Sequence, residues 1–186
     1  MDQWLSPECT THPSFKLRTL YTWEAGRSEM LSRLILHLKG PRASAPWQVY
    51  AQQFVRRLNI ESGWRLCIVP APPRKILHRD HAYYWGEALA QNLGASFLPC
   101  LEKISSGSQR QARGDERALI EMRSHEKSTK EDSILWVFAD DVFTTGATAA
   151  AAYAALGRPP HFEVWTLVQR RLACRPSEDL LYRSDE

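Results

Sequence analysis

Residues 137–148 read VFADDVFTTGAT, and this stretch decides the fold class. It continues the apolar run ILWVFA at 134–139, which predicts a buried strand. Two carboxylates, Asp140 and Asp141, follow the run, and alanine-rich sequence over 147–156 predicts a helix beyond them. A strand, a polar turn and a helix in this order indicate an α/β protein with its ligand crevice at the strand's carboxyl end.

The turn between that strand and helix has the composition of a phosphate site. Backbone N–H groups at the start of a helix, with threonine hydroxyls beside them, are donors suited to a phosphate. Gly146 lets the backbone approach closely, and Asp140 and Asp141 lie within reach of sugar hydroxyls or hydrated Mg²⁺. The alternative to a phosphate site is an acidic strand end followed by a threonine that caps the helix. This alternative accounts for fewer of the residues in the stretch 137–148. Neither the Walker A lysine nor the GxGxxG fingerprint is present.

The remaining apolar patterns predict strands that alternate with helices. Helices are expected over residues 28–39, 47–58 and 84–93, and strands over 65–69, 95–98 and 162–168. Because these strands are almost wholly apolar, we expect a parallel sheet of four or five strands with helices on both faces. The polar, proline-broken start predicts a loose arm over 1–19, followed by a single domain over 20–186.

Composition excludes several classes of protein. The chain has 186 residues, of which 44% are hydrophobic and 24% charged, so it is not wholly disordered. A net charge of +3 lacks the dense basic character of a dedicated nucleic-acid binder. We expect no membrane span and no signal peptide. The 4 cysteines are few and widely spaced, which favours a reducing compartment, so we expect a cytoplasmic protein.

The string at 137–148 resembles the phosphoribosyl pyrophosphate-binding motif of the type I phosphoribosyltransferases, in which two acids precede a T-T-G-x-T loop. The resemblance implies that Asp140 and Asp141 hold the ribose 2- and 3-hydroxyls. It also implies that the 5-phosphate is bound by Thr144, Thr145, Gly146, Ala147 and Thr148.

Other segments are similar to the ComF-type proteins, a competence-associated branch of this fold. They are Tyr21, the LI..LK pattern at 34–39, the VPAP strand end at 69–72 and Arg79. The chain departs from that family in lacking the cysteine-rich zinc ribbon, and its R-G-F-N-Q segment reads RDHAY at 79–83. The resemblance implies protein partners in DNA uptake.

The pyrophosphate end of such a ligand is expected at the turn PAPPRK, residues 70–75, since in this fold that position holds pyrophosphate through backbone N–H groups. Prolines lack the N–H, so binding there would depend on the few remaining amides and on Arg74 and Lys75, with Arg79 and Lys103 as further candidates. A rigid turn with solvated bases is the open alternative. The polar segment 102–132, with Lys103, Arg110 and Arg113, is either a mobile hood loop or a solvated helix with flexible ends.

The leading hypothesis is therefore binding of phosphoribosyl pyrophosphate with Mg²⁺, with transfer of the phosphoribosyl group to a nitrogen acceptor as the reaction. A non-catalytic adaptor or ligand sensor in DNA uptake is the second hypothesis. A third is direct binding of single-stranded DNA through exposed tryptophans and the cluster Arg170, Arg171 and Arg175.

Overall fold

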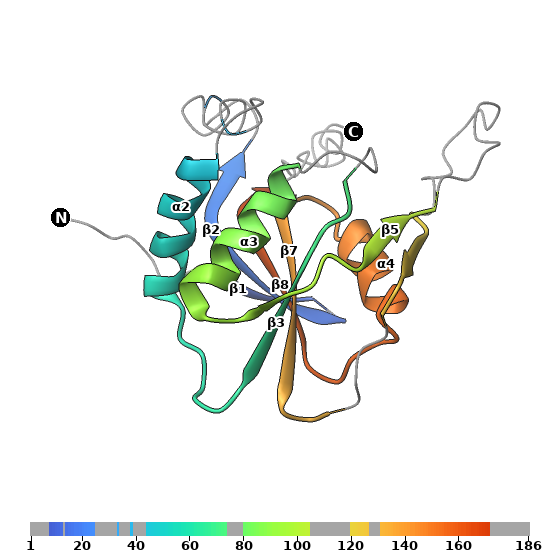
Figure 1. The fold of residues 1–186 in the computed structure, drawn as a ribbon. Coiled ribbons are helices and arrows are strands. Elements are labelled where there is room, and N and C mark those ends of the chain that lie inside the picture. The colour runs from blue at the N-terminus through green and yellow to red at the C-terminus, as the bar shows by residue number, and fades with distance from the viewer. Residues whose placement is uncertain are drawn as a thin grey trace, which may run out of the picture.

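The computed structural model describes residues 8–12, 14–24, 33, 38, 44–73, 80–104, 120–126 and 131–171. In chain order the elements are β1 (Glu8–His12), β2 (Phe15–Glu24), α2 (Ser44–Arg57), β3 (Arg65–Pro70), α3 (His81–Leu93), β4 (Ser96–Phe97), β5 (Leu101–Lys103), β6 (Met122–Ser124), β7 (Ile134–Phe143), α4 (Ala147–Ala155) and β8 (Phe162–Arg171) (Figure 1). The expected helix over 28–39 lies outside the described residues, except for Arg33 and Leu38, which are helical.

The main sheet has the strand order β1-β2-β8-β7-β3-β4. Neighbouring strands from β2 to β4 run parallel, and β1 pairs antiparallel with β2 at the edge. The expectation of an α/β protein with a parallel sheet is confirmed. No helix among the described ranges is long and apolar enough to cross a membrane.

The start of the chain differs from the loose arm expected over residues 1–19. Residues 8–12 and 15–19 belong to strands, since β1 pairs with β2 from Glu8↔Thr19 to His12↔Phe15. Strand β2 pairs in turn with β8. The contacts of β2 with β8 join parts of the chain that are more than a hundred residues apart. The polar sequence of β1 does not by itself indicate a strand.

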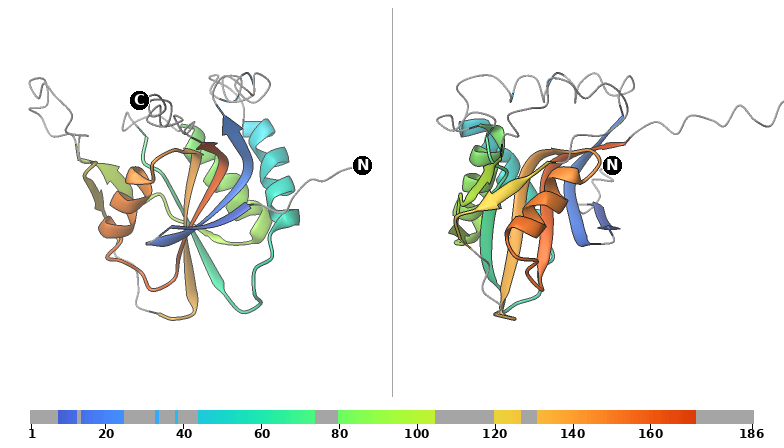
Figure 2. Two further views of the ribbon diagram at one scale, coloured as in Figure 1. Left: turned by 180° about the vertical axis from the view of Figure 1, so that it is seen from behind. Right: turned by 90° about the vertical axis from the view of Figure 1, so that its right-hand side faces the viewer.

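Helices cover both faces of the sheet, as expected. Figure 2 shows the helices on either side of the sheet. One core cluster joins residues of α2 and α3 to Val137 of β7, and the other joins residues of α4 to Phe138. Successive side chains of a strand point to opposite faces. A strand covered on both faces is apolar at every position, which explains the run at 134–139.

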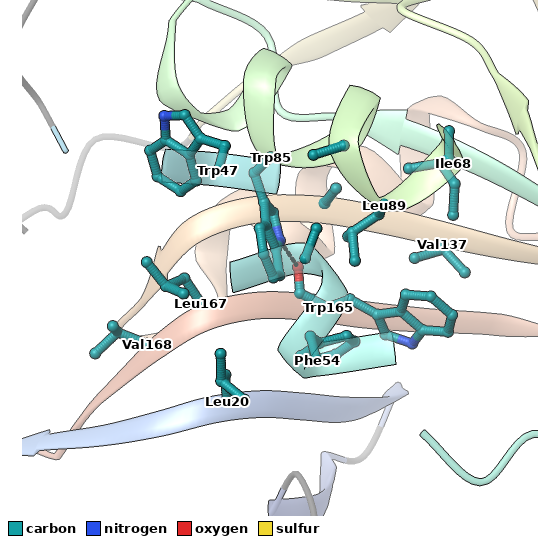
Figure 3. Packing of buried hydrophobic residues seen from close by; sticks show 14 of the residues in the cluster. Leu20, Trp47, Phe54, Ile68, Trp85, Leu89, Val137, Trp165, Leu167 and Val168 are labelled. Atoms are coloured by element: carbon teal, nitrogen blue, oxygen red, sulfur yellow. Dashed lines mark hydrogen bonds between the residues drawn. The ribbon is translucent and has the colours of Figure 1, made fainter. Parts of the chain in front are cut away.

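The core under α2 and α3 is aromatic. Trp47, Phe54, Trp85 and Trp165 are almost fully buried there (Figure 3). The rings of Phe54 and Trp85 meet edge to face with centroids 5.4 Å apart, and the Trp85 indole N–H donates to the Trp165 carbonyl at 3.1 Å. This hydrogen bond links α3 to β8, one of the two central strands of the sheet.

The polar segment 102–132 is described only in part. Its described ends form a hairpin of β5 and β6, with Glu102 opposite Arg123 and joined to it by an ion pair of 2.8 Å. Cross-strand pairing holds these two ends extended, so a helix over 102–132 would be confined to the residues between the two strands. Residues 105–119, which include Arg110 and Arg113, lie outside the described residues.

The chain reverses its direction of travel across the sheet between β3 and β7. From β3 the connection through α3 leads outward to β4, and from β7 the connection through α4 leads the other way to β8. The two helices lie on opposite faces. In open α/β sheets a ligand crevice forms at such a switch point, outside the carboxyl ends of the two strands.

Candidate functional site

The two acids lie inside β7 and not after it. The strand continues to Phe143, since Asp140 pairs in register with Thr166 of β8 and Val142 pairs with Val168. Asp140 lies on the α4 face of the sheet with Phe138. The two carboxyl groups approach each other closely enough for a side-chain hydrogen bond, so the pair lies together at the carboxyl edge of the sheet, at the switch point.

A small hollow, open to solvent, lies on the α4 side of this edge. It is lined by Phe138, Asp140, Val142, Phe143, Thr144, Gly146, Thr148, Ala149 and Val164. The structure thus brings together four of the residues singled out in the sequence: Asp140, Thr144, Gly146 and Thr148. Thr145 and Ala147 are exposed and do not line the hollow.

Gly146 determines the shape of the loop beside the hollow. Its φ of +80° is left-handed, a conformation that glycine adopts without strain, and it occupies the N-cap position of α4. A Cβ added there would lie 3.0 Å from Cζ of Phe143. Because glycine brings no capping side chain, the first N–H groups of α4 are left to an external acceptor, and the helix dipole favours an anion.

Burial dominates the electrostatics of Asp140. It raises the pKa of this carboxyl well above the ordinary value, and the charge of Asp141 raises it further. The exposed Lys103, at the end of β5, opposes both effects. Lys103, expected to bind pyrophosphate, is therefore within electrostatic range of the acids.

The β3 side of the crevice has fewer donors than expected. The N–H of Ala71 donates to the carbonyl of Ala139 at 2.8 Å, and Pro72 and Pro73 have no N–H. Three of the expected pyrophosphate residues, Arg74, Lys75 and Arg79, lie outside the described residues.

Sequence reasoning gave no role to Asp80. It is the N-cap of α3, where its Oδ1 accepts the Tyr83 N–H at 3.4 Å. Burial raises its pKa, the Tyr83 hydrogen bond lowers it, and the charges of Asp141 and Lys103 act on it in opposite directions. The helix was expected to begin at Tyr84 and begins at His81, so an acid a few residues before the apolar pattern was the available signal.

Thr166 was also missed. It is fully buried, in register with Asp140, and its hydroxyl has no hydrogen-bond partner among the described residues. In-register neighbours on adjacent strands face the same side, so this hydroxyl lies on the face of Asp140. A threonine inside the apolar strand FEVWTLV was its signal.

The acids fit a magnesium ion that is shared with a ligand. In the described part of the chain, no three His, Cys, Asp or Glu side chains gather as a metal cage. Mg²⁺ commonly takes one or two carboxylates, keeps several waters and completes its shell with substrate phosphates. Asp140 and Asp141 offer that donor set.

Comparison with known proteins adds no family assignment. Neither the protein-family models searched nor the curated proteins contain a match to this chain.

Proposed function

We propose that this protein binds phosphoribosyl pyrophosphate together with Mg²⁺ at the carboxyl edge of β7 and β3. One observation carries the proposal: Asp140 of the strand lines the same hollow as Thr144, Gly146 and Thr148 of the turn that opens α4. A carboxylate suited to sugar hydroxyls thus adjoins donors suited to a phosphate. The position at a topological switch point supports it independently.

Each group has a distinct part in this scheme. The turn from Thr144 to Thr148 binds the 5-phosphate through N–H groups and hydroxyls. Asp140 and Asp141 accept hydrogen bonds from the ribose hydroxyls and so fix the sugar in one orientation. Mg²⁺, when bound, neutralises charge on the pyrophosphate. Lys103 adds a cation near the acids.

We further propose that the reaction, where the protein catalyses one, is transfer of the phosphoribosyl group to a nitrogen acceptor. The bond from ribose C1 to the pyrophosphate oxygen breaks, and pyrophosphate leaves with the electron pair. The acceptor nitrogen forms the new bond to C1 and gives up its proton. The chain contributes orientation and charge and no nucleophile.

The second candidate is a ligand sensor that binds the same molecule without transferring it and acts with protein partners in DNA uptake. The altered segment RDHAY at 79–83 favours it, because the glycine, asparagine and glutamine of the family's R-G-F-N-Q segment are absent there. Two buried free thiols, Cys67 and Cys100, support a reducing, cytoplasmic location for either candidate.

Calorimetry separates these possibilities. Titration with phosphoribosyl pyrophosphate, ribose 5-phosphate and ribose, each with Mg²⁺, is expected to give binding of the two phosphorylated ligands and none of ribose. Pyrophosphate release is then measured over a panel of nucleobases. Release with one base identifies a transferase, whereas binding without release identifies a sensor. Equal affinity for ribose and ribose 5-phosphate would contradict a phosphate site.

A further inference from the structure

The side chain of Thr166 points to the face of the sheet that carries the hollow. Its chain neighbours Trp165 and Leu167 are buried in the core under α2 and α3, where Figure 3 shows both. Because successive side chains of a strand point to opposite faces, Thr166 points to the α4 face. Val164, two residues earlier on β8, lines the hollow on that face. Thr166 is therefore the next side chain of β8 toward the carboxyl edge.

The hydroxyl of Thr166 is buried without a hydrogen-bond partner. The residue is fully buried, and no described residue forms a hydrogen bond with its Oγ1. A buried hydroxyl that makes no hydrogen bond destabilises a fold, whereas valine has the same branched shape without that cost. Packing alone therefore does not explain a threonine at this position.

Two polar residues flank Thr166 in register, Thr19 of β2 on one side and Asp140 of β7 on the other. Adjacent strands lie about 4.8 Å apart, a gap that two short polar side chains can bridge. The Thr19 hydroxyl already donates to the carbonyl of Tyr21 at 2.9 Å. A carboxylate has acceptor sites for several hydrogen bonds, and its charge makes each of them stronger than a bond between neutral groups. Asp140 is therefore the better acceptor for the Thr166 hydroxyl.

We propose that Thr166 is a positioning residue, whose hydroxyl donates to the Asp140 carboxylate when a phosphorylated sugar binds and holds that carboxylate toward the sugar hydroxyls. The inference rests on the proposed function, which places a sugar at Asp140. Being fully buried, Thr166 acts through Asp140 and does not touch the sugar. The turn that opens α4 binds the phosphate without it. Loss of the hydroxyl should therefore weaken binding of the sugar and spare binding of phosphate.

Three variants separate the hydroxyl from the packing of the side chain. Thr166→Val removes the hydroxyl and keeps the branched shape, whereas Thr166→Ser keeps the hydroxyl. Thr19→Val is the matched control, because it makes the same change at a buried threonine on the far side of Thr166 from Asp140. In thermal unfolding, Thr166→Val should be at least as stable as the natural protein. Thr19→Val should be less stable, since it loses the bond to Tyr21.

Calorimetry in the presence of Mg²⁺ then compares ribose 5-phosphate with inorganic phosphate. The natural protein should bind ribose 5-phosphate more tightly, because only this ligand has hydroxyls that reach Asp140. Thr166→Val should bind ribose 5-phosphate at least about fivefold more weakly than the natural protein and inorganic phosphate within about twofold. Thr166→Ser and Thr19→Val should stay within about twofold of the natural protein for both ligands.

The inference is overturned if Thr166→Val binds ribose 5-phosphate as tightly as the natural protein does. An equal loss in Thr166→Ser or Thr19→Val, or an equal loss for inorganic phosphate, would also overturn it. In each of these cases the natural protein still prefers ribose 5-phosphate, so the proposed function stands. If the natural protein binds both ligands equally, there is no sugar site at Asp140, and the proposed function fails together with the role of Thr166.

Discussion

The backbone N–H of Asp141 donates to Oδ1 of Asp140 at 2.9 Å. This bond holds the Asp140 carboxylate against the strand, on the side of the hollow. The carboxyl of Asp141 lies close enough to form a side-chain hydrogen bond with it. The two acids therefore form one acidic group beside the turn that opens α4.

The raised pKa of Asp140 predicts a stabilising substitution. In the unfolded chain an aspartate ionises near pH 3.9, but burial and the charge of Asp141 raise the pKa in the folded protein. The folded state therefore binds this proton more tightly than the unfolded state does. As pH rises from about 3.9 through the pKa of the folded state, the ionised carboxyl progressively lowers the free energy of unfolding. Asp140→Asn removes that loss and should be more stable than the natural protein at pH 7.

Urea unfolding of the ligand-free proteins between about pH 3 and pH 8 measures this difference. The advantage of Asp140→Asn should shrink as pH falls and be nearly absent below about pH 3.9. A variant that is less stable at pH 7, or a difference independent of pH, would show that the carboxyl is not held in an unfavourable environment.

Gly146→Ala should damage both the loop and its ligand binding. A left-handed alanine costs about 1 kcal/mol, and its Cβ would press on the ring of Phe143 beside the hollow. Gly94→Ala is the matched control, because Gly94 is also left-handed, with φ +62°, but a Cβ there meets nothing within 4 Å. Both variants should lose stability, while only Gly146→Ala should bind ribose 5-phosphate at least about tenfold more weakly. Equal affinities of the two variants for ribose 5-phosphate would show that this loop does not bind the phosphate.

Trp85→Phe should destabilise the fold without changing the site. It removes the indole donor to the Trp165 carbonyl and leaves space in a core where Trp85 is fully buried. We expect a loss of about 2 kcal/mol in the free energy of unfolding. Trp64→Phe, at a half-buried position, should cost less than about 1 kcal/mol. If both variants unfold at the same urea concentration, the Trp85 contact contributes little.

The centre of the fold could be predicted because its strands are covered on both faces. Val137 and Phe138 face different cores, so the run at 134–139 is apolar throughout and its pattern alone indicates a buried parallel strand. Strand β1 could not be predicted, because its polar sequence becomes a strand only through pairing with β2. Strand β2 did carry a local signal, since Phe15, Leu17, Tyr21 and Trp23 occupy alternate positions, but it was not predicted.

In the candidate site, too, some residues could be predicted from local sequence and others could not. A local string places Asp140, Thr144 and Gly146 together, since strand, turn and helix follow one another in the chain. Asp80 lies at the start of α3, a different helix. Thr166 lies beside Asp140 because β8 pairs with β7 in this register. Their proximity to the acids depends on strand order, which no local pattern contains.

Calorimetry with phosphoribosyl pyrophosphate and Mg²⁺, on the natural protein and on the double variant Asp140→Asn with Asp141→Asn, tests the central proposal most directly. The natural protein should bind. The double variant should keep a cooperative thermal transition and bind at least about tenfold more weakly, a loss of about 1.4 kcal/mol. Absence of binding by the natural protein, or equal affinity in the folded double variant, would contradict a ribose site at these two carboxylates.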